Sequence, residues 1–385
     1  MKKPKVMTIL GTRPEIIRLS RVIALLDEYT EHVLVHTGQN YDYELNQVFF
    51  EDLGVRAPDH CLGVDTSTLG HVLGETLIQS EDVMALEKPD VVVILGDTNS
   101  SIAAIIAKRR CIPVYHLEAG NRCFDGNVPE ETNRKIIDHI ADFNLVYSEH
   151  ARRNLLAEGI PSRRIYLIGS PMHEVLNAYR DRIDASTILQ KLKLTSKGYF
   201  VVSCHRQENV DNGKNLRRIL HLLNTLVEQY DVPVIVSTHP RTRKSLDALA
   251  VDCDERIQFL APFSFSDYVN LQLNALCTLS DSGTISEESA ILGIPAVTIR
   301  NAMERPEALD CGSISLVGLD TDSVLPSVKL AIEMTEAERL PAVPEAYQVL
   351  DTSRRVVRLI LGTFRLSNEW DGIVGPVSNQ QGIGE

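Results

Sequence analysis

Short runs of apolar residues alternate with stretches of helical periodicity along most of the chain. In the first half, strands are expected at 6–10, 32–36, 91–95, 114–117, 143–147 and 165–168. Helices are expected at 15–29, 69–86, 100–110 and 130–141. Continuous apolar runs are typical of strands buried on both faces, so the alternation predicts parallel βαβ units with helices on both sides of a sheet.

The pattern pauses at Ser170 and Pro171, and a polar, charged stretch follows over 179–197. A second series of strands is expected at 199–203, 234–237, 257–260, 276–279, 296–299 and 313–316. A chain of 385 residues is also long for one domain. We therefore predict an α/β protein of two Rossmann-like, doubly wound domains that face each other across a cleft.

The expected domains are 1–171 and 172–366. A helix near 353–366 is expected to pack back on the first domain, although it follows the second in sequence. Residues 367–385 have no periodicity, which predicts a flexible tail.

Composition excludes several classes of protein. Hydrophobic residues make up 44% and charged residues 24%, as in soluble globular proteins. The net charge of −13 argues against a nucleic acid or an anionic membrane as partner. No apolar run has the length of a signal peptide or a membrane span, so a cytoplasmic location is expected. The 7 cysteines are scattered without a CxxC pair, which favours reduced thiols over disulfides or zinc.

One segment has the composition of an anion site. The strand expected at 276–279 leads into the turn 281–284 (DSGT), and a helix is expected from about Ile285. The unpaired N–H groups and dipole of a helix N-terminus attract anions, and Gly283 allows the backbone close to one. A carboxylate one turn inside, such as Glu288, can accept hydrogen bonds from ribose hydroxyls. The segment predicts a nucleotide-diphosphate site, although an ordinary capped helix has the same composition.

Charged or imidazole side chains follow six of the expected strands. They are Arg13, Asp97, Glu118, His205 with Arg206, His239 with Arg241, and Asp281. Singly, each is more typical of a helix cap or a brace within a loop. Because doubly wound sheets bind ligands beyond the carboxyl ends of their strands, the set as a whole favours a site. Cations from both halves of an acidic protein favour a diphosphate ligand.

Glu130 and Arg134 lie four residues apart in an expected helix, so they share one face. A surface ion pair has the same spacing and contributes little to stability. The functional interpretation is a carboxylate that its own arginine orients near Glu118. Asp97, Glu118, Glu130 and His205 are then candidate proton carriers.

Missing motifs disfavour other enzyme classes. The sequence contains no nucleophile elbow, HExxH motif, clustered metal-ligand spacing or Walker lysine loop. Its first βα turn reads Gly-Thr-Arg-Pro instead of GxGxxG, which argues against a nicotinamide-dependent dehydrogenase.

The motifs GTRPE, GDTNS, HLEAGNR, PEETNR, CHRQEN, THPRTR, DSGTISEE and ERPE follow one another in this order. With them, the chain resembles the non-hydrolysing UDP-N-acetylglucosamine 2-epimerase family to about residue 366. The resemblance implies a GT-B arrangement, a UDP-2-acetamido sugar substrate, a homodimer, and no metal or nicotinamide cofactor. It also implies elimination of UDP across C1–C2 to a 2-acetamidoglycal, and re-addition with protonation of C2 from the opposite face.

By motif, the resemblance assigns the handling of the proton to Asp97, Glu118 and Glu130. His205 would assist departure of UDP, and Arg134 would orient or neutralise the acidic cluster. The implied UDP-binding residues are Arg13, Arg18, His205, Tyr268, Ser282, Gly283, Thr284 and Glu288. Arg18 stands where a lysine is common in the family, and Thr284 where a glycine is common.

The same comparison bears on the sugar. The segment 36–50 departs from members that UDP-N-acetylglucosamine activates, which weakens the expectation of a regulatory site. HLEAGNRCFDGNVPEE, SCHRQENV and SDSGTISEES resemble most the subgroup that makes UDP-N-acetyl-L-fucosamine from UDP-2-acetamido-2,6-dideoxy-L-talose for capsule or O-antigen synthesis. Alternatives are conversion of UDP-N-acetylglucosamine to UDP-N-acetylmannosamine, a GT-B glycosyltransferase, a hydrolysing relative and a non-catalytic sensor of UDP-sugars.

Overall fold

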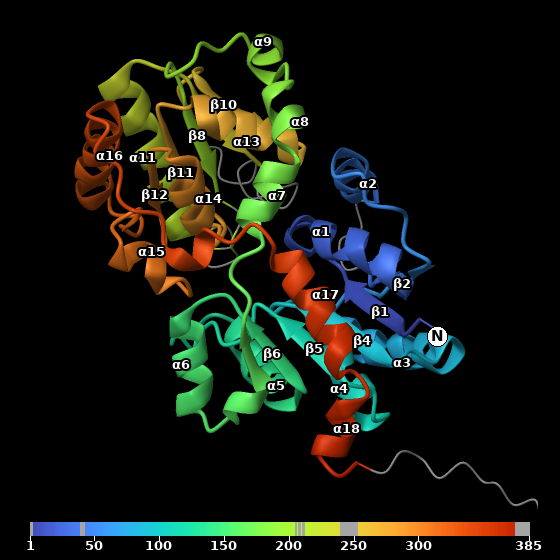
Figure 1. Ribbon diagram of the computed structural model, residues 1–385. Helices are drawn as coiled ribbons and strands as arrows, with labels where there is room; N and C mark the ends of the chain where they lie inside the picture. The colour runs from blue at the N-terminus through green and yellow to red at the C-terminus, as the bar shows by residue number, and fades with distance from the viewer. Residues whose placement is uncertain are drawn as a thin grey trace, which may run out of the picture.

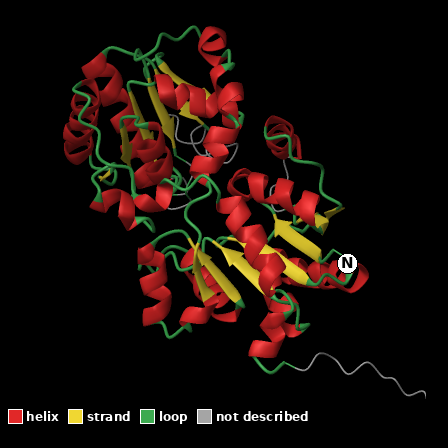
Figure 2. Cartoon of the chain, in the orientation of Figure 1, coloured by secondary structure: helices red, strands yellow, loops and turns green. Residues whose placement is uncertain are grey.

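The computed structural model describes residues 3–38, 43–204, 206, 209, 212–238 and 253–373, the side chains of 43–47 excepted. Two parallel sheets form two separate α/β units, the first in the lower part of Figure 1 and the second in the upper part. In Figure 2, helices flank each group of strands, as expected for doubly wound sheets.

The first sheet has the strand order β3-β2-β1-β4-β5-β6-β7, and every pair is parallel. Its strands are β1 (Lys5–Leu10), β2 (Glu31–His36), β3 (His60–Cys61), β4 (Val91–Leu95), β5 (Val114–Leu117), β6 (Phe143–Val146) and β7 (Ile165–Leu167). The order reverses between β1 and β4, and a crevice forms at such a point beyond the carboxyl ends of the strands.

Helices cover both faces of this sheet. They are α1 (Arg13–Tyr29), α2 (Tyr43–Asp52), α3 (Leu69–Glu87), η1 (Asn99–Ala103), α4 (Ala104–Arg109), α5 (Glu130–Ile140) and α6 (Glu149–Ala157). β1 places Val6 and Leu10 in the core beneath α1, and Met7 and Ile9 in the core on the opposite face. Because both faces are buried, the strand reads as one apolar run in the sequence.

The second sheet has the order β10-β9-β8-β11-β12-β13 and is also parallel. Its strands are β8 (Phe200–Ser203), β9 (Val234–Ser237), β10 (Ile257–Leu260), β11 (Cys277–Ser280), β12 (Ala296–Thr298) and β13 (Ser315–Leu316). The helices around it include α11 (Gly213–Tyr230), α13 (Phe265–Asn274), α14 (Ile285–Leu292), α15 (Pro306–Asp310) and α16 (Thr321–Glu336).

Two further segments connect the units. α7 (Met172–Ala178), α8 (Arg180–Asp184) and α9 (Ile188–Leu192) occupy the connection between the sheets. At the C-terminal end, α17 (Thr352–Thr363) returns to the first unit and lies beside α1 in Figure 1. Its Val356 and Ile360 belong to the same core as Leu19 and Val22 of α1. The chain therefore crosses between the units twice.

Several expected elements differ in detail. The helix expected at 100–110 is divided into η1 and α4, where Thr98 caps the shorter turn through its side chain. β3 was not expected, because a strand of 2 residues leaves no periodicity to detect. The last regular element was expected to end at residue 366, but helix α18 (Leu366–Trp370) follows α17. Residues 374–385 of the expected tail lie outside the described residues.

No helix in the part of the chain that the structure describes combines the length and the apolar character needed to cross a bilayer.

Candidate functional site

The carboxyl ends of both sheets face one cavity of about 140 Å³ between the two units. From the first unit, its lining residues are Pro14, Glu15, Arg18, Leu95, Gly96, Asp97, Thr98, Glu118 and Glu130. From the second, they are Arg206, Ser282, Gly283, Thr284, Glu304 and Arg305. The cavity thus brings together the three predicted proton carriers that the structure describes and the predicted anion-binding turn.

Asp97 lies just after β4, and Arg134 from α5 holds its carboxylate. The Nε of Arg134 donates to Asp97 Oδ2 at 2.8 Å, and its Nη2 lies 2.5 Å from the same oxygen. Gly96, before Asp97, has φ +69°, which glycine adopts at little steric cost. The arginine therefore fixes a carboxylate that projects from a tight turn.

Glu118 follows β5 with a left-handed backbone, φ +66°. A non-glycine residue pays about 1 kcal/mol or more for this conformation, and such residues concentrate at functional sites. Arg305 Nη2 donates to Glu118 Oε1 at 2.6 Å, and Arg18 Nη1 lies 3.4 Å from Oε2. One cation from each unit thus faces this carboxylate.

Glu130 lines the cavity, but the prediction that it pairs with Arg134 is wrong. Arg134 Nη1 donates instead to Glu131 Oε2 at 2.9 Å, while the rest of the guanidinium faces Asp97. Glu131 and Arg134 are 6% and 4% exposed, so the arginine turns toward the buried side of α5. Within the described residues, Glu130 forms no ion pair, which leaves its carboxylate open to the cavity.

Glu15 is a site residue that was not predicted. Its Oε2 accepts hydrogen bonds from Gly11 N at 3.0 Å, Thr12 N at 2.8 Å and Thr12 Oγ1 at 2.7 Å. Its Oε1 accepts one from Thr98 Oγ1 at 3.0 Å. Burial raises the pKa of Glu15 to about 7, against the opposing effect of these donors. The Thr-x-x-Glu capping box was a detectable signal for this residue.

Arg305 and its neighbours were also missed, although they belong to the motif ERPE. Arg305 is 4% exposed and contacts Glu304 at 3.2 Å and Glu287 at 3.3 Å, besides Glu118. Glu287, at 0% exposure, also accepts from Arg18 Nη1 at 3.1 Å and from the Ser170 hydroxyl. These contacts join the two units through charges that are almost wholly out of water.

Glu304 also contacts arginines from both units. Arg300 Nη1 donates to Glu304 Oε2 at 2.7 Å, and Arg134 Nη2 of the first unit lies 3.9 Å from Oε1. Burial opposes ionisation of Glu304, but Arg300, Arg206 and Arg305 together hold its pKa well below the usual range. The carboxylate is therefore ionised in the cleft.

The predicted anion turn lies directly before α14. Ser282 Oγ and Thr284 Oγ1 are 2.9 Å apart, and Thr284 N donates to Ser282 Oγ at 3.3 Å. A Cβ on Gly283 would overlap Arg305 Nη1 and Glu304 Oε1, so glycine lets these two side chains lie against the turn. The turn therefore places a helix N-terminus and an arginine beside each other.

The remaining predicted UDP contacts lie outside this cavity lining. Glu288 is 6% exposed and accepts from Gln272 Nε2 at 2.7 Å, and burial raises its pKa. Burial also raises the pKa of Tyr268 on α13, with Glu288 adding to the shift. Arg13 is half-buried, with its guanidinium 5.6 Å from the ring centre of Phe49.

His205, His239 and Arg241 lie outside the described residues, so their predicted roles stay predictions. Arg206, which was predicted beside His205, is described. Its Nε donates to the backbone oxygen of Asp281 at 2.9 Å.

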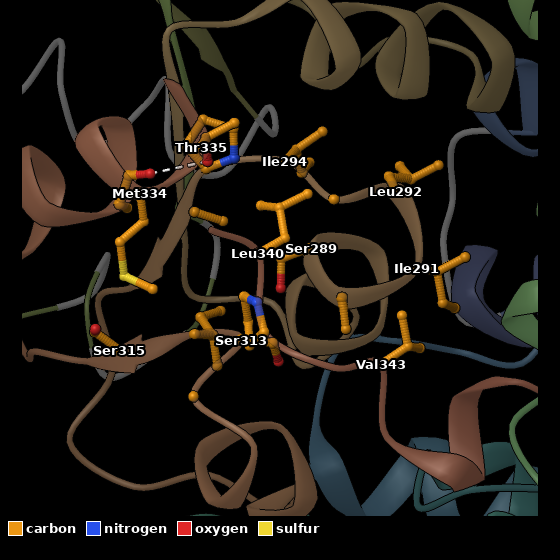
Figure 3. Close-up of a pocket in the computed structure, with 18 of the residues that line it drawn as sticks. Ser289, Ile291, Leu292, Ile294, Ser313, Ser315, Met334, Thr335, Leu340 and Val343 are labelled. Atoms are coloured by element: carbon orange, nitrogen blue, oxygen red, sulfur yellow. Dashed lines mark hydrogen bonds between the residues drawn. The ribbon is translucent and has the colours of Figure 1, made fainter. Parts of the chain in front are cut away.

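A larger cavity of about 380 Å³ lies at the opposite end of α14, between that helix, β12, β13 and α16. Figure 3 shows Ile294, Leu340 and Met334 around it. Its lining includes no ionisable side chain and no residue of the cleft. This cavity exceeds the cleft in volume, but acid–base chemistry and phosphate binding need the groups of the cleft.

Comparison with known proteins identifies the family. The family model described as UDP-N-acetylglucosamine 2-epimerase matches residues 25–361. The chain belongs to this family. A UDP-N-acetylglucosamine 2-epimerase of Methanocaldococcus jannaschii is 36% identical over 85% of this chain and 92% of its own length. A UDP-2,3-diacetamido-2,3-dideoxy-D-glucuronate 2-epimerase of Pseudomonas aeruginosa is 33% identical over 86% of this chain and 93% of its own.

Solved structures confirm the predicted fold class. A structure of a UDP-N-acetylglucosamine 2-epimerase from Rickettsia bellii has TM-score 0.89 and 47% identity, covering 95% of this chain and 98% of its own. The M. jannaschii enzyme in complex with UDP-GlcNAc and UDP has TM-score 0.87 and 34% identity, with coverage of 93% and 99%. A trehalose 6-phosphate synthase, 14% identical at TM-score 0.60, shares the GT-B-like fold alone. The protein is thus a UDP-sugar 2-epimerase of GT-B-like fold.

Proposed function

We propose that the cleft inverts C2 of a UDP-2-acetamido sugar by elimination of UDP and re-addition. No carbonyl adjoins C2, so simple removal of its proton is unfavourable. In elimination, a base takes the C2 proton, the C1–O bond breaks, and its electron pair leaves with UDP. A C1–C2 double bond remains in a 2-acetamidoglycal. Return of UDP to C1 with protonation of C2 from the opposite face gives the epimer.

One observation carries this proposal: three carboxylates face a phosphate-type turn across a single cavity. Asp97, Glu118 and Glu130 come from the first unit, and the turn 282–284 comes from the second. The reaction needs a proton acceptor and a proton donor near C2, together with an anion site at the leaving group. A glycosyltransferase would use the anion site but has no evident need for the three carboxylates.

The arginines supply the electrostatic part of the mechanism. Arg18, Arg206 and Arg305 line the cavity beside the turn, where negative charge develops on UDP as the C1–O bond breaks. We assign assistance at the diphosphate to His205 from its motif. From the same resemblance, we assign a diphosphate contact to Arg13, with support from Arg18, and a ribose contact to Glu288.

The proposed sugar is UDP-2-acetamido-2,6-dideoxy-L-talose, converted to UDP-N-acetyl-L-fucosamine for capsule or O-antigen synthesis. This choice rests on the motif resemblance of the segments around Glu118, His205 and Ser282. The names of the relatives favour a second candidate, UDP-N-acetylglucosamine, which the M. jannaschii and Neisseria meningitidis proteins are named for.

Parallel assays with both UDP-sugars test the substrate. Purified protein is incubated with each compound, and formation of the C2 epimer is followed by proton NMR. The proposal expects kcat/KM at least tenfold higher for the L-talo compound. A preference for UDP-N-acetylglucosamine would replace the proposed sugar and keep the reaction. No epimer from either, with UDP bound, would overturn the proposed reaction for both.

Labelled substrate tests the elimination step separately. The oxygen that bridges C1 and the β-phosphate is replaced by ¹⁸O, and phosphorus NMR follows its position. Cleavage of C1–O frees the β-phosphate to rotate, so the label is expected to reach non-bridging positions in recovered substrate. If all ¹⁸O stays between C1 and the β-phosphate while the epimer forms, UDP does not leave C1 and rotate before it returns.

We also propose a homodimer, which the family resemblance implies. α3 exposes Ile78 and Leu86 at 63% and 70%, and their spacing of eight residues places them on one side of the helix, where a second copy would bury them. Light scattering on an eluting sample is expected to give twice the chain mass of 42.9 kDa. A mass of one chain across micromolar concentrations would contradict the dimer.

A further inference from the structure

His116 and Asp138 lie beneath the cavity, outside its lining, and are each 1% exposed. His116 is on β5, two residues before Glu118, and its Nε2 donates to the backbone oxygen of Gly96 at 2.9 Å. A carbonyl oxygen only accepts, so Nε2 carries the proton of this bond. The ring therefore ties β5 to the turn that presents Asp97.

Asp138 lies against the same ring and hydrogen-bonds to the turn after Glu118. Its Oδ1 lies 3.0 Å from His116 Nδ1, a contact without hydrogen-bond geometry. Both of its carboxylate oxygens accept from Gly120 N at 3.2 Å, and Oδ2 accepts from Arg122 Nη1 at 2.7 Å. Asp138 itself belongs to α5, the helix that begins at Glu130. One carboxylate thus contacts, directly or through His116, the three segments that carry the proton-handling residues.

The turns beside Asp138 and His116 have left-handed backbone conformations. Gly96, Glu118 and Gly120 have φ of +69°, +66° and +77°. Gly120 has no room for a side chain, because a Cβ would overlap the carbonyl oxygen of Ala151. Backbones of this kind persist only where surrounding contacts over-determine them.

Stability alone gives little reason for such groups at this place. Buried ion pairs are often neutral or unfavourable relative to apolar side chains of similar volume. His116, Arg122 and Asp138 are all at most 2% exposed, and they meet where both carboxylate turns leave the sheet. Their location therefore indicates a role in holding those turns.

We propose that His116 and Asp138 are positioning residues that set the relative placement of Asp97, Glu118 and α5. The proposal rests on the proposed function for its effect on catalysis. Neither residue needs to touch substrate. A misplacement of about 1 Å costs on the order of 100-fold in rate, so loss of the ring contact affects turnover more than binding.

The test compares His116→Phe, His116→Gln and Asp138→Asn. Phenylalanine keeps a ring without a donor, whereas the glutamine amide can donate to Gly96 O as His116 Nε2 does. His116→Phe and Asp138→Asn are expected to lower kcat about 10- to 100-fold with KM and the Kd for UDP changed less than threefold. His116→Gln is expected to recover much of the loss. His71→Gln is the matched control, because His71 on α3 is 57% exposed and its ion-pair partner, Asp65, lies outside this cluster.

Amide hydrogen exchange supplies a readout that needs no substrate. Faster exchange is expected at 96–99 in His116→Phe, and at 118–122 in Asp138→Asn, with the rest of the sheet unchanged. If His116→Phe does not fold, His116→Asn replaces it, because its shorter amide does not reach Gly96 O.

Three results would overturn the proposal: kcat of His116→Phe within twofold of wild type, unchanged exchange at both turns, or KM and UDP affinity lost as strongly as kcat. If wild-type protein moves no C2 proton, the proposed function fails by itself. The exchange data then decide alone: faster exchange at the turns supports the positioning role, and unchanged exchange overturns it.

Discussion

Glu118 shows how much of the site depends on single side chains. It combines a left-handed backbone with contacts to Arg18 and Arg305, one from each unit. A carboxylate held in this way has a fixed direction toward the cavity, which general acid–base catalysis requires.

Replacement of Glu118 by Gln keeps the shape and removes the charge. General acid–base groups contribute about 10²- to 10⁴-fold, so kcat is expected to fall by that range while UDP still binds the second unit. Epimerisation assays and calorimetry with UDP check the two parts. Glu149→Gln, at an exposed pair on α6, is the matched control. A Glu118→Gln protein with kcat within threefold of wild type would exclude Glu118 as a proton carrier.

The buried carboxyl of Glu15 predicts a dependence of stability on pH. Burial raises its pKa to about 7 from 4.5, so between these values the folded state holds a proton that the unfolded state has lost. The free energy of unfolding therefore falls as pH rises through this window, by at most about 1.4 kcal/mol per pH unit from this group. Above pH 7 its contribution levels off.

Urea denaturation of wild type and Glu15→Gln from pH 4.5 to 8 measures this contribution. The variant is expected to lose the downward slope that Glu15 causes between about pH 5 and 7. Parallel curves for the two proteins would show that Glu15 does not titrate in this window.

The sequence could locate residues whose signal is local. Asp97 and Glu118 were predictable because each follows a strand of the sheet. Arg305 and Glu287 were not, because their contacts join residues 187 and 269 positions apart, to Glu118 and Arg18. Burial of such pairs depends on how the two units meet, which no local pattern encodes.

At the scale of elements, the turn before α14 makes a separate prediction. Alanine at Gly283 would push a methyl group against Arg305 and Glu304. Because both the backbone approach and the arginine would shift, the Kd for UDP is expected to rise at least tenfold in calorimetry. Gly362→Ala on α17 meets no atom within 4 Å and serves as control. Unchanged UDP affinity in Gly283→Ala would place the phosphates elsewhere.

The strands with the strongest apolar runs were predictable as elements, and β4, β5, β9 and β10 have the expected bounds. β4, β5 and β9 are buried on both faces, so their apolar composition identifies them, whereas β10 is a half-buried edge strand. The side of α5 that Arg134 faces was harder to predict. The spacing of four residues predicted a pair between Arg134 and Glu130, whereas the buried arginine contacts Glu131, three residues before it.

At the scale of the whole molecule, buried charges hold the two units together. Glu287 contacts Arg18 of the first unit and Arg305 of the second, and Ser170 of the connecting segment. The sequence predicted two domains that face each other across a cleft, but it did not show which buried charges join them.

Glu287→Gln removes the shared negative charge of this contact. It leaves two buried guanidinium groups poorly compensated, so the free energy of unfolding is expected to fall by about 3–5 kcal/mol in urea. Asp310→Asn is the matched control, because its pair with His150 also joins the units but is exposed. That change is expected to cost less than about 1 kcal/mol. Equal losses in the two variants would contradict the importance of the buried contact.

The most direct test of the central claim is the fate of the C2 hydrogen in D2O. Wild-type protein and Glu118→Gln are incubated with the UDP-sugar that the parallel assays select, and C2 is followed by proton NMR. The account predicts deuterium at C2 in every epimer that wild type forms, and exchange at least 100-fold slower in the variant. Epimer that keeps protium at C2, or equal exchange in the two proteins, would contradict a proton-transfer site at this cleft.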